Sequence, residues 1–199
     1  LSKLMTVDDK IVATAAAHAI ARLGTPRAAE ILDKSMSDQF AAACLVCGKT
    51  LAAQGSQVEA AKLLSKLTKF TEAAEHVRLA AMLQFVELQG ADGRKMLASA
   101  LESDDRDMFN MALRTVRLLP EKAALPIVVE AIKDAPPART TLLVILLGEL
   151  GDPGGLSAVM QAVRSNHPAV QIAGLQALAK LGTADHVTLL VDAATNGPT

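Results

Sequence analysis

The sequence predicts an all-α fold, a right-handed α-solenoid of about six stacked antiparallel helix pairs. Three observations predict it: turn sequences recur about every 31 residues, apolar residues recur in step with them, and 51% of the 199 residues are apolar while only 2% are aromatic. A chain this apolar can bury enough surface to fold. One helix pair cannot bury both of its faces, so neighbouring pairs must cover them. The small side chains that dominate the composition allow these pairs to stack closely.

Six turn markers define the repeat. They are five glycines and one proline, at positions 24, 55, 90, 120, 151 and 182, with spacings of 31, 35, 30, 31 and 31. Glycine ends helices in the left-handed backbone region, and proline also stops a helix. The longer spacing indicates an insertion near residues 69–75.

Two columns of apolar residues support this register. Four residues before the markers stand Ile20, Leu51, Val86, Val116, Leu147 and Leu178, and eight residues after them stand Leu32, Leu63, Ala98, Val128, Val159 and Leu190. All twelve residues are apolar, which is typical of the core-facing side of helices. The period is therefore a property of the sequence as a whole.

Each unit is predicted to contain two helices. The first follows the marker, at residues 26–36, 58–67, 93–101, 122–133, 153–164 and 184–194, and Pro26 and Pro153 suit its first turn. A polar break with Asp or Asn follows, and a second helix then runs to the next marker. The chain starts in a second helix near Asp8 and ends in a first helix, which gives five complete pairs between two half units, with a closing turn at residues 196–198. We therefore expect one solenoid over residues 1–199. Because the chain opens on Leu1, we expect this solenoid to be a segment of a longer protein.

The units resemble HEAT-like repeats, and more narrowly the bacterial HEAT-like units first grouped with the phycobilisome lyases. The resemblance rests on Leu147-Gly148-Glu149-Leu150-Gly151-Asp152-Pro153, Leu156, Val159, His167-Pro168-Ala169-Val170, Ala173, Leu175, Ala177-Leu178 and Leu181-Gly182. Residues 12–32 match nearly as well, and residues 77–81 carry the Val-Arg-x-Ala-Ala stretch of such second helices. Gln171 and Pro120 depart from the pattern, and residues 44–67 resemble a tetratricopeptide helix pair. The resemblance implies a binding scaffold.

The sequence shows no catalytic or metal-binding constellation. Cys44 and Cys47 form a C-x-x-C inside a helix, but no second C-x-x-C or histidine pair completes a zinc site. We interpret both as small packing residues, with redox chemistry as the alternative. The four histidines are widely spaced, and no phosphate-binding or nucleophile motif is present. The sequence therefore predicts neither a cofactor nor a metal.

One column of the second helices is polar where its neighbours are apolar. Six residues before the markers stand His18, Lys49, Gln84, Arg114, Ile145 and Gln176. The resemblance implies that the second helices line a concave face, so this column would form a ladder along it. Two stripes at helical spacing lean basic: Lys10, Thr14, His18 and Arg22, and Arg106, Asn110, Arg114 and Arg117. The alternative is the ordinary solvated face of amphipathic helices.

These observations predict a non-catalytic protein–protein interaction scaffold whose partner is an acidic or extended protein or peptide. The candidate partner-binding residues are His18, Lys49, Gln84, Arg114, Arg117 and Gln176. Two alternatives stay open: a lyase or other enzyme with a HEAT-like body, and a nucleic-acid-binding HEAT-like protein such as an alkylpurine glycosylase. The net charge of −1 and the absence of Trp and Tyr disfavour nucleic acid. No apolar run approaches the ~18 residues of a membrane-spanning helix.

Overall fold

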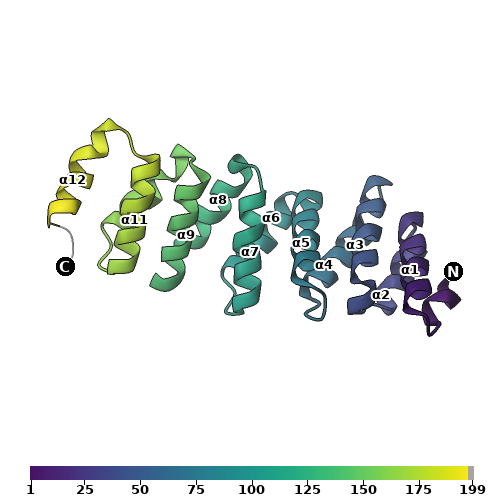
Figure 1. The fold of residues 1–199 in the computed structure, drawn as a ribbon. Helices are drawn as coiled ribbons and strands as arrows, with labels where there is room; N and C mark the ends of the chain where they lie inside the picture. Colours follow the sequence, from purple (N-terminus) through teal and green to yellow (C-terminus); the bar gives the residue numbers. More distant parts are fainter. Residues whose placement is uncertain (197–199) are drawn as a thin grey trace. The chain divides into compact units, whose positions relative to one another are not determined.

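The computed structural model describes residues 1–196, and in this range it contains helices and turns but no β-strand. The chain divides into two compact units, Leu1–Arg94 and Lys95–Thr199. Each unit consists of stacked helix pairs (Figure 1). The predicted all-α fold is therefore confirmed. The single continuous stack and its right-handed sense stay predictions, and so does the closing turn, because residues 197–199 lie outside the described residues.

In the first unit, a short 3₁₀ turn precedes five α-helices. Their bounds are η1 Ser2–Thr6, α1 Lys10–Leu23, α2 Pro26–Lys34, α3 Asp38–Ala53, α4 Gln57–Lys69 and α5 Glu75–Gln89. The second helices α1, α3 and α5 lie side by side, with α1 packed on α3 and α3 on α5 (Figure 1). The first helices α2 and α4 pack on α3 and against each other. Helix α6, Ala91–Leu101, crosses the boundary between the units.

The second unit repeats this order. Its elements are α7 Arg106–Leu118, α8 Glu121–Ile132, α9 Pro137–Leu150, η2 Pro153–Gly155, α10 Leu156–Val163, α11 Pro168–Leu181, η3 Ala184–His186 and α12 Val187–Asn196. Helix α9 packs on both α7 and α11, and α10 packs on α11. The predicted first helices thus correspond to α2, α4, α6, α8, η2 with α10, and η3 with α12. The predicted insertion is the loop between α4 and α5.

The turn markers end the second helices as predicted, with one difference in backbone conformation. Four of the glycines have a positive φ: Gly24, Gly55, Gly90 and Gly151. Gly182 does not, because its φ is −70°. A Cβ at Gly182 would lie 2.5 Å from the carbonyl oxygen of Leu178. Glycine is therefore required here because the backbone passes close to Leu178, and not because the turn is left-handed.

The two apolar columns form the core. Ten of their twelve residues are buried, and the exceptions are Ala98 and Leu190, which are half-buried. In α6, Leu97 and Leu101 are fully buried, and Leu97 lies one position before the predicted core residue Ala98.

Two buried or half-buried arginines connect second helices to the ends of first helices. Arg78 of α5 donates from Nε to the carbonyl oxygen of Thr68 near the end of α4, at 3.1 Å. Arg139 of α9 donates to the carbonyl oxygens of Glu102 and Ser103 at 2.8 and 3.0 Å. These carbonyls lie at or just beyond the ends of first helices, where backbone acceptors lack intrahelical partners. Each arginine therefore fixes the position of a second helix relative to a first helix.

Candidate functional site

The first unit carries three of the predicted partner-binding residues on consecutive second helices. His18 of α1 is half-buried, Lys49 of α3 is exposed and Gln84 of α5 is half-buried. The Oε1 atom of Gln84 is buried and has no hydrogen-bond partner among the described residues. Because α3 packs against both α1 and α5, the structure places the three residues on adjoining helices of one unit.

The second unit carries the other three. Arg114 and Arg117 are exposed on α7, Gln176 is exposed on α11, and the half-buried Ile145 lies on α9 between these helices. The Nε of Arg117 donates to Oε2 of Glu149 at 2.7 Å, and both side chains are about two-fifths exposed. Part of the positive charge predicted for the basic stripe on α7 is therefore matched by a carboxylate on α9. The ladder formed by the polar column stays a prediction, since its residues belong to two separate units.

The basic stripe on α1 is partly covered by α3. The side-chain nitrogen of Gln39 donates to Oγ1 of Thr14 at 3.0 Å and to the carbonyl oxygen of Lys10 at 3.1 Å. Thr14 is half-buried, whereas Lys10 and Arg22 are exposed. The stripe on α7 is more open, because Arg106, Asn110 and Arg114 are all exposed.

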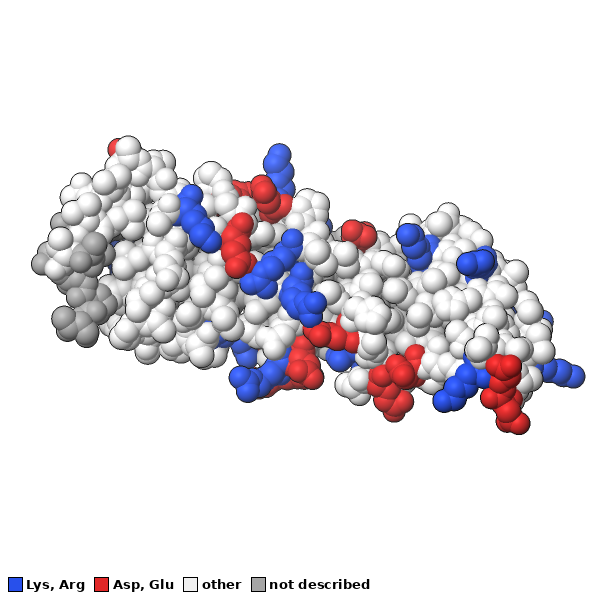
Figure 2. Space-filling model, viewed as in Figure 1, with Lys and Arg blue, Asp and Glu red and all other residues white. Residues whose placement is uncertain are grey.

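The sequence reasoning missed a set of exposed aliphatic side chains on the second helices of the second unit. Leu118 of α7 is 56% exposed, Leu142 of α9 is 42% exposed and Ile172 of α11 is 49% exposed. The available signal was Ile145, the one apolar member of the polar column. Figure 2 shows the same contrast, with charged side chains over α7 and mostly uncharged surface over α9 and α11.

The two cysteines of α3 are buried packing residues. Both side chains are fully buried, and Sγ of Cys44 donates to the carbonyl oxygen of Leu32 at 3.8 Å. Burial raises the pKa of the Cys44 thiol to about 12, with smaller contributions from the charges of Cys47 and Asp33. Burial also raises the pKa of Cys47, to about 11. Since the thiolate is the nucleophile and metal ligand, this environment disfavours both kinds of chemistry.

The other candidate groups have structural contacts. Asp105 caps α7 by accepting from the backbone nitrogens of Asp107 and Met108. Among the described residues, no group of three or more His, Cys, Asp or Glu side chains could hold a metal ion. No helix in the described range has the length and apolar character that crossing a membrane requires.

Comparisons with known proteins bear on the repeat. Residues 141–199 match the family described as HEAT repeats. The structure is similar to the crystal structure of an engineered protein, Northeast Structural Genomics Consortium target OR329, with 20% sequence identity over 98% of this chain and 83% of that chain, and a TM-score of 0.37. Likeness at this TM-score carries no conclusion about fold or function. No curated protein matches the chain.

Proposed function

We propose that the chain is a non-catalytic scaffold that binds a protein partner on the exposed side of its second helices. The match of residues 141–199 to HEAT repeats and the order of the helix pairs support this proposal. HEAT repeats generally mediate protein–protein interactions. The exposed side of α7, α9 and α11 is the best candidate contact surface. We refer to it as the second-helix face; it comprises Arg114, Arg117, Leu118, Leu142, Ile145, Ile172 and Gln176.

The distribution of exposed aliphatic side chains carries the proposal. In the second unit, the large aliphatic residues that are exposed on α7 to α11 all belong to second helices: Leu118, Leu142 and Ile172. None of the exposed large apolar residues lies on α8 or α10. Surface aliphatic groups that gather on one side, beside charged groups, are typical of interaction sites.

The charges beside these groups favour an acidic partner. Arg114 and Arg117 lie on α7, and Arg117 forms an ion pair with Glu149 of α9. A carboxylate of the partner could bind Arg117 bidentately in place of Glu149. On the side that Figure 2 shows, the basic side chains over either unit are interrupted by uncharged surface. This pattern suits a short acidic and aliphatic peptide segment better than a continuous phosphate backbone.

Reversal of two charges tests the proposal. Peptides are selected from a displayed random library by binding to the immobilised full chain. The affinity of the selected peptides for the chain is then measured by fluorescence polarisation. We expect enrichment of peptides that combine acidic and aliphatic residues. The double variant R114E/R117E should bind them at least about tenfold more weakly, since it replaces attraction by repulsion at two positions. Its thermal unfolding should stay close to that of the parent chain, because a half-exposed ion pair contributes about 1 kcal/mol or less.

The matched control is K122E/K133E, which makes the same change of charge at exposed positions on and beside α8 in the same unit. This control should keep the affinity of the parent chain. Equal weakening by both double variants would indicate a general electrostatic effect and would reject the second-helix face. Selection of peptides that R114E/R117E binds unchanged would reject it as well.

A further inference from the structure

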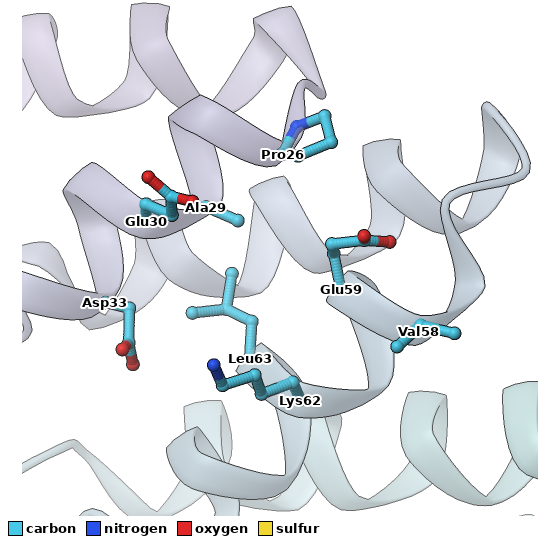
Figure 3. A pocket seen from close by; sticks show the side chains of 8 residues that line it. All are labelled: Pro26, Ala29, Glu30, Asp33, Val58, Glu59, Lys62 and Leu63. Carbon is cyan, nitrogen blue, oxygen red and sulfur yellow. The ribbon is translucent and has the colours of Figure 1, made fainter.

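A groove separates the first helices α2 and α4 of the first unit. Its volume is about 300 Å³, and its lining comes from both helices: Pro26, Ala29, Glu30, Asp33, Val58, Glu59, Lys62 and Leu63. Ala29 and Leu63 are buried and form the floor. Val58 is 77% exposed, which makes it one of the most exposed apolar residues described. In Figure 3, Leu63 rises from α4 toward Ala29 of α2.

Carboxylates lie around this apolar floor. Figure 3 shows Glu30 and Glu59 on opposite sides of Leu63, with Asp33 further along α2. Asp33 pairs with Lys66 at 2.7 Å, whereas neither Glu30 nor Glu59 has an ion pair among the described residues. The ammonium group of Lys62 is turned toward the Asp33 end in Figure 3. Glu30 and Glu59 therefore hold negative charge on either side of an exposed apolar surface.

We propose that the α2–α4 groove binds an arginine side chain presented by a segment of a protein partner. An arginine has an apolar stem that can lie on Ala29, Leu63 and Val58, and a guanidinium that can reach a carboxylate of Glu30 or Glu59. The groove offers an apolar floor for the stem and acceptors for the head group. A purely aliphatic side chain would leave both carboxylates without a partner, and an acidic one would be repelled by them.

Glu59 also has a local role that the experiment must separate from binding. It lies in the first turn of α4, where a carboxylate stabilises the helix dipole. Glu30 lies in the middle of α2 and has no such role. A loss of affinity with an unchanged unfolding temperature therefore reports on binding rather than on the helix.

The test uses a five-residue peptide, acetyl-Ala-Ala-Arg-Ala-Ala-amide, titrated into the full chain while the amide signals of Ala29 and Leu63 are followed by NMR. Two matched peptides replace arginine by citrulline, its neutral isostere, or by norleucine, which keeps only the apolar stem. We expect saturable shifts with the arginine peptide. The citrulline and norleucine peptides should bind at least about threefold more weakly, the size expected for a partly exposed ion pair.

Variants assign the effect to the groove. E30Q/E59Q should lower the affinity for the arginine peptide at least about threefold. The control E72Q/E87Q, at exposed positions on the same unit, should leave this affinity unchanged. K62Q should raise it, because the variant removes a competing cation. Equal affinity for the arginine and citrulline peptides would overturn the proposal. So would tighter binding of norleucine, which would identify an apolar ligand, or the absence of shifts at Ala29 and Leu63. These outcomes do not depend on Arg114 or Arg117, so this proposal and the proposed function can fail separately.

Discussion

Single small residues decide how closely neighbouring helices approach one another. A Cβ added at Gly148 of α9 would lie 2.9 Å from Cα and 3.0 Å from Cβ of Ala177 on α11. Gly174 of α11 is equally confined, because an added Cβ would lie 2.6 Å from the backbone nitrogen of Val163. Neither contact can be relieved by rotation of a flexible side chain. At these two helix contacts, a larger side chain has no room, which agrees with the Ala-rich, aromatic-poor composition.

The variant Gly148→Ala separates two opposing effects. Helix propensity alone would make alanine more favourable than glycine by about 1 kcal/mol. The contact with Ala177 should reverse the sign, because overpacking of a rigid contact costs about 1–3 kcal/mol. We expect a lower free energy of unfolding in urea denaturation.

A second variant that removes the methyl group of Ala177 provides the control. The double variant G148A/A177G moves the methyl group from α11 to α9 and should recover part of the lost stability. A Gly148→Ala chain that is more stable than its parent would show that α9 and α11 are free to separate at this point.

Helix α3 illustrates how an element can carry a recognisable motif without its chemistry. Its C-x-x-C spacing places Cys44 and Cys47 on the buried side, together with Phe40 and Leu51. Both thiols have a raised pKa because burial disfavours the thiolate. The element uses these residues as small apolar groups, and its exposed side carries Lys49.

The raised thiol pKa values predict a pH dependence of stability. In the unfolded chain the thiols ionise near their ordinary pKa of about 8.5, whereas in the folded chain they stay protonated to about 12 and about 11. Above about pH 9 the unfolded state binds fewer protons than the folded state. The free energy of unfolding should therefore fall between about pH 9 and pH 11, by up to about 1.4 kcal/mol per pH unit for each thiol.

Chemical denaturation as a function of pH measures this dependence. The double variant C44A/C47A lacks both thiols and should show a shallower decline over the same interval, with lysine titration common to both chains. Parallel curves for the two chains would show that the thiols do not ionise differently on folding.

At the scale of the whole molecule, the chain comprises two compact units, each with its own core. Leu51 and Leu147 occupy the same position four residues before their markers, one in each unit, and are 0% and 1% exposed. In repeat proteins, stability is approximately a sum of local terms and contacts between neighbours. Loss of packing in one unit should therefore affect the helices of that unit first.

The variants L51A and L147A form a matched pair for hydrogen exchange measured by mass spectrometry. Each should cost about 3 kcal/mol, the usual consequence of a cavity at a fully buried leucine. L147A should reduce protection in α8 to α11 more than in α1 to α4, and L51A should do the reverse. An identical protection pattern in both variants would mean that the 199 residues unfold as one cooperative body.

Much of this fold could be predicted because it depends on local periodicity. The six markers, the apolar columns and the first-helix ranges follow from residue spacing, and the helices formed within a few residues of the predicted bounds. The prediction for Gly182 was wrong, since its turn is set by contact with Leu178 and not by backbone handedness. The candidate site was harder to predict, because spacing shows which side of a helix is exposed but not what lies opposite it. The ion pair of Arg117 with Glu149 spans 32 residues and has no local signature.

The sequence by itself determined the all-α class, the order of the helix pairs and the buried columns. Residues spaced by the 3.6-residue period of a helix lie on one side of it, so the spacing of apolar residues shows which side is buried. Only the tertiary structure decided which groups meet between helices. Arg139 reaches the carbonyls of Glu102 and Ser103, and Glu30 of α2 and Glu59 of α4 line the same groove. It also distributed the predicted partner-binding residues between two units. Such contacts depend on packing in three dimensions, where side chains far apart in the sequence come within reach.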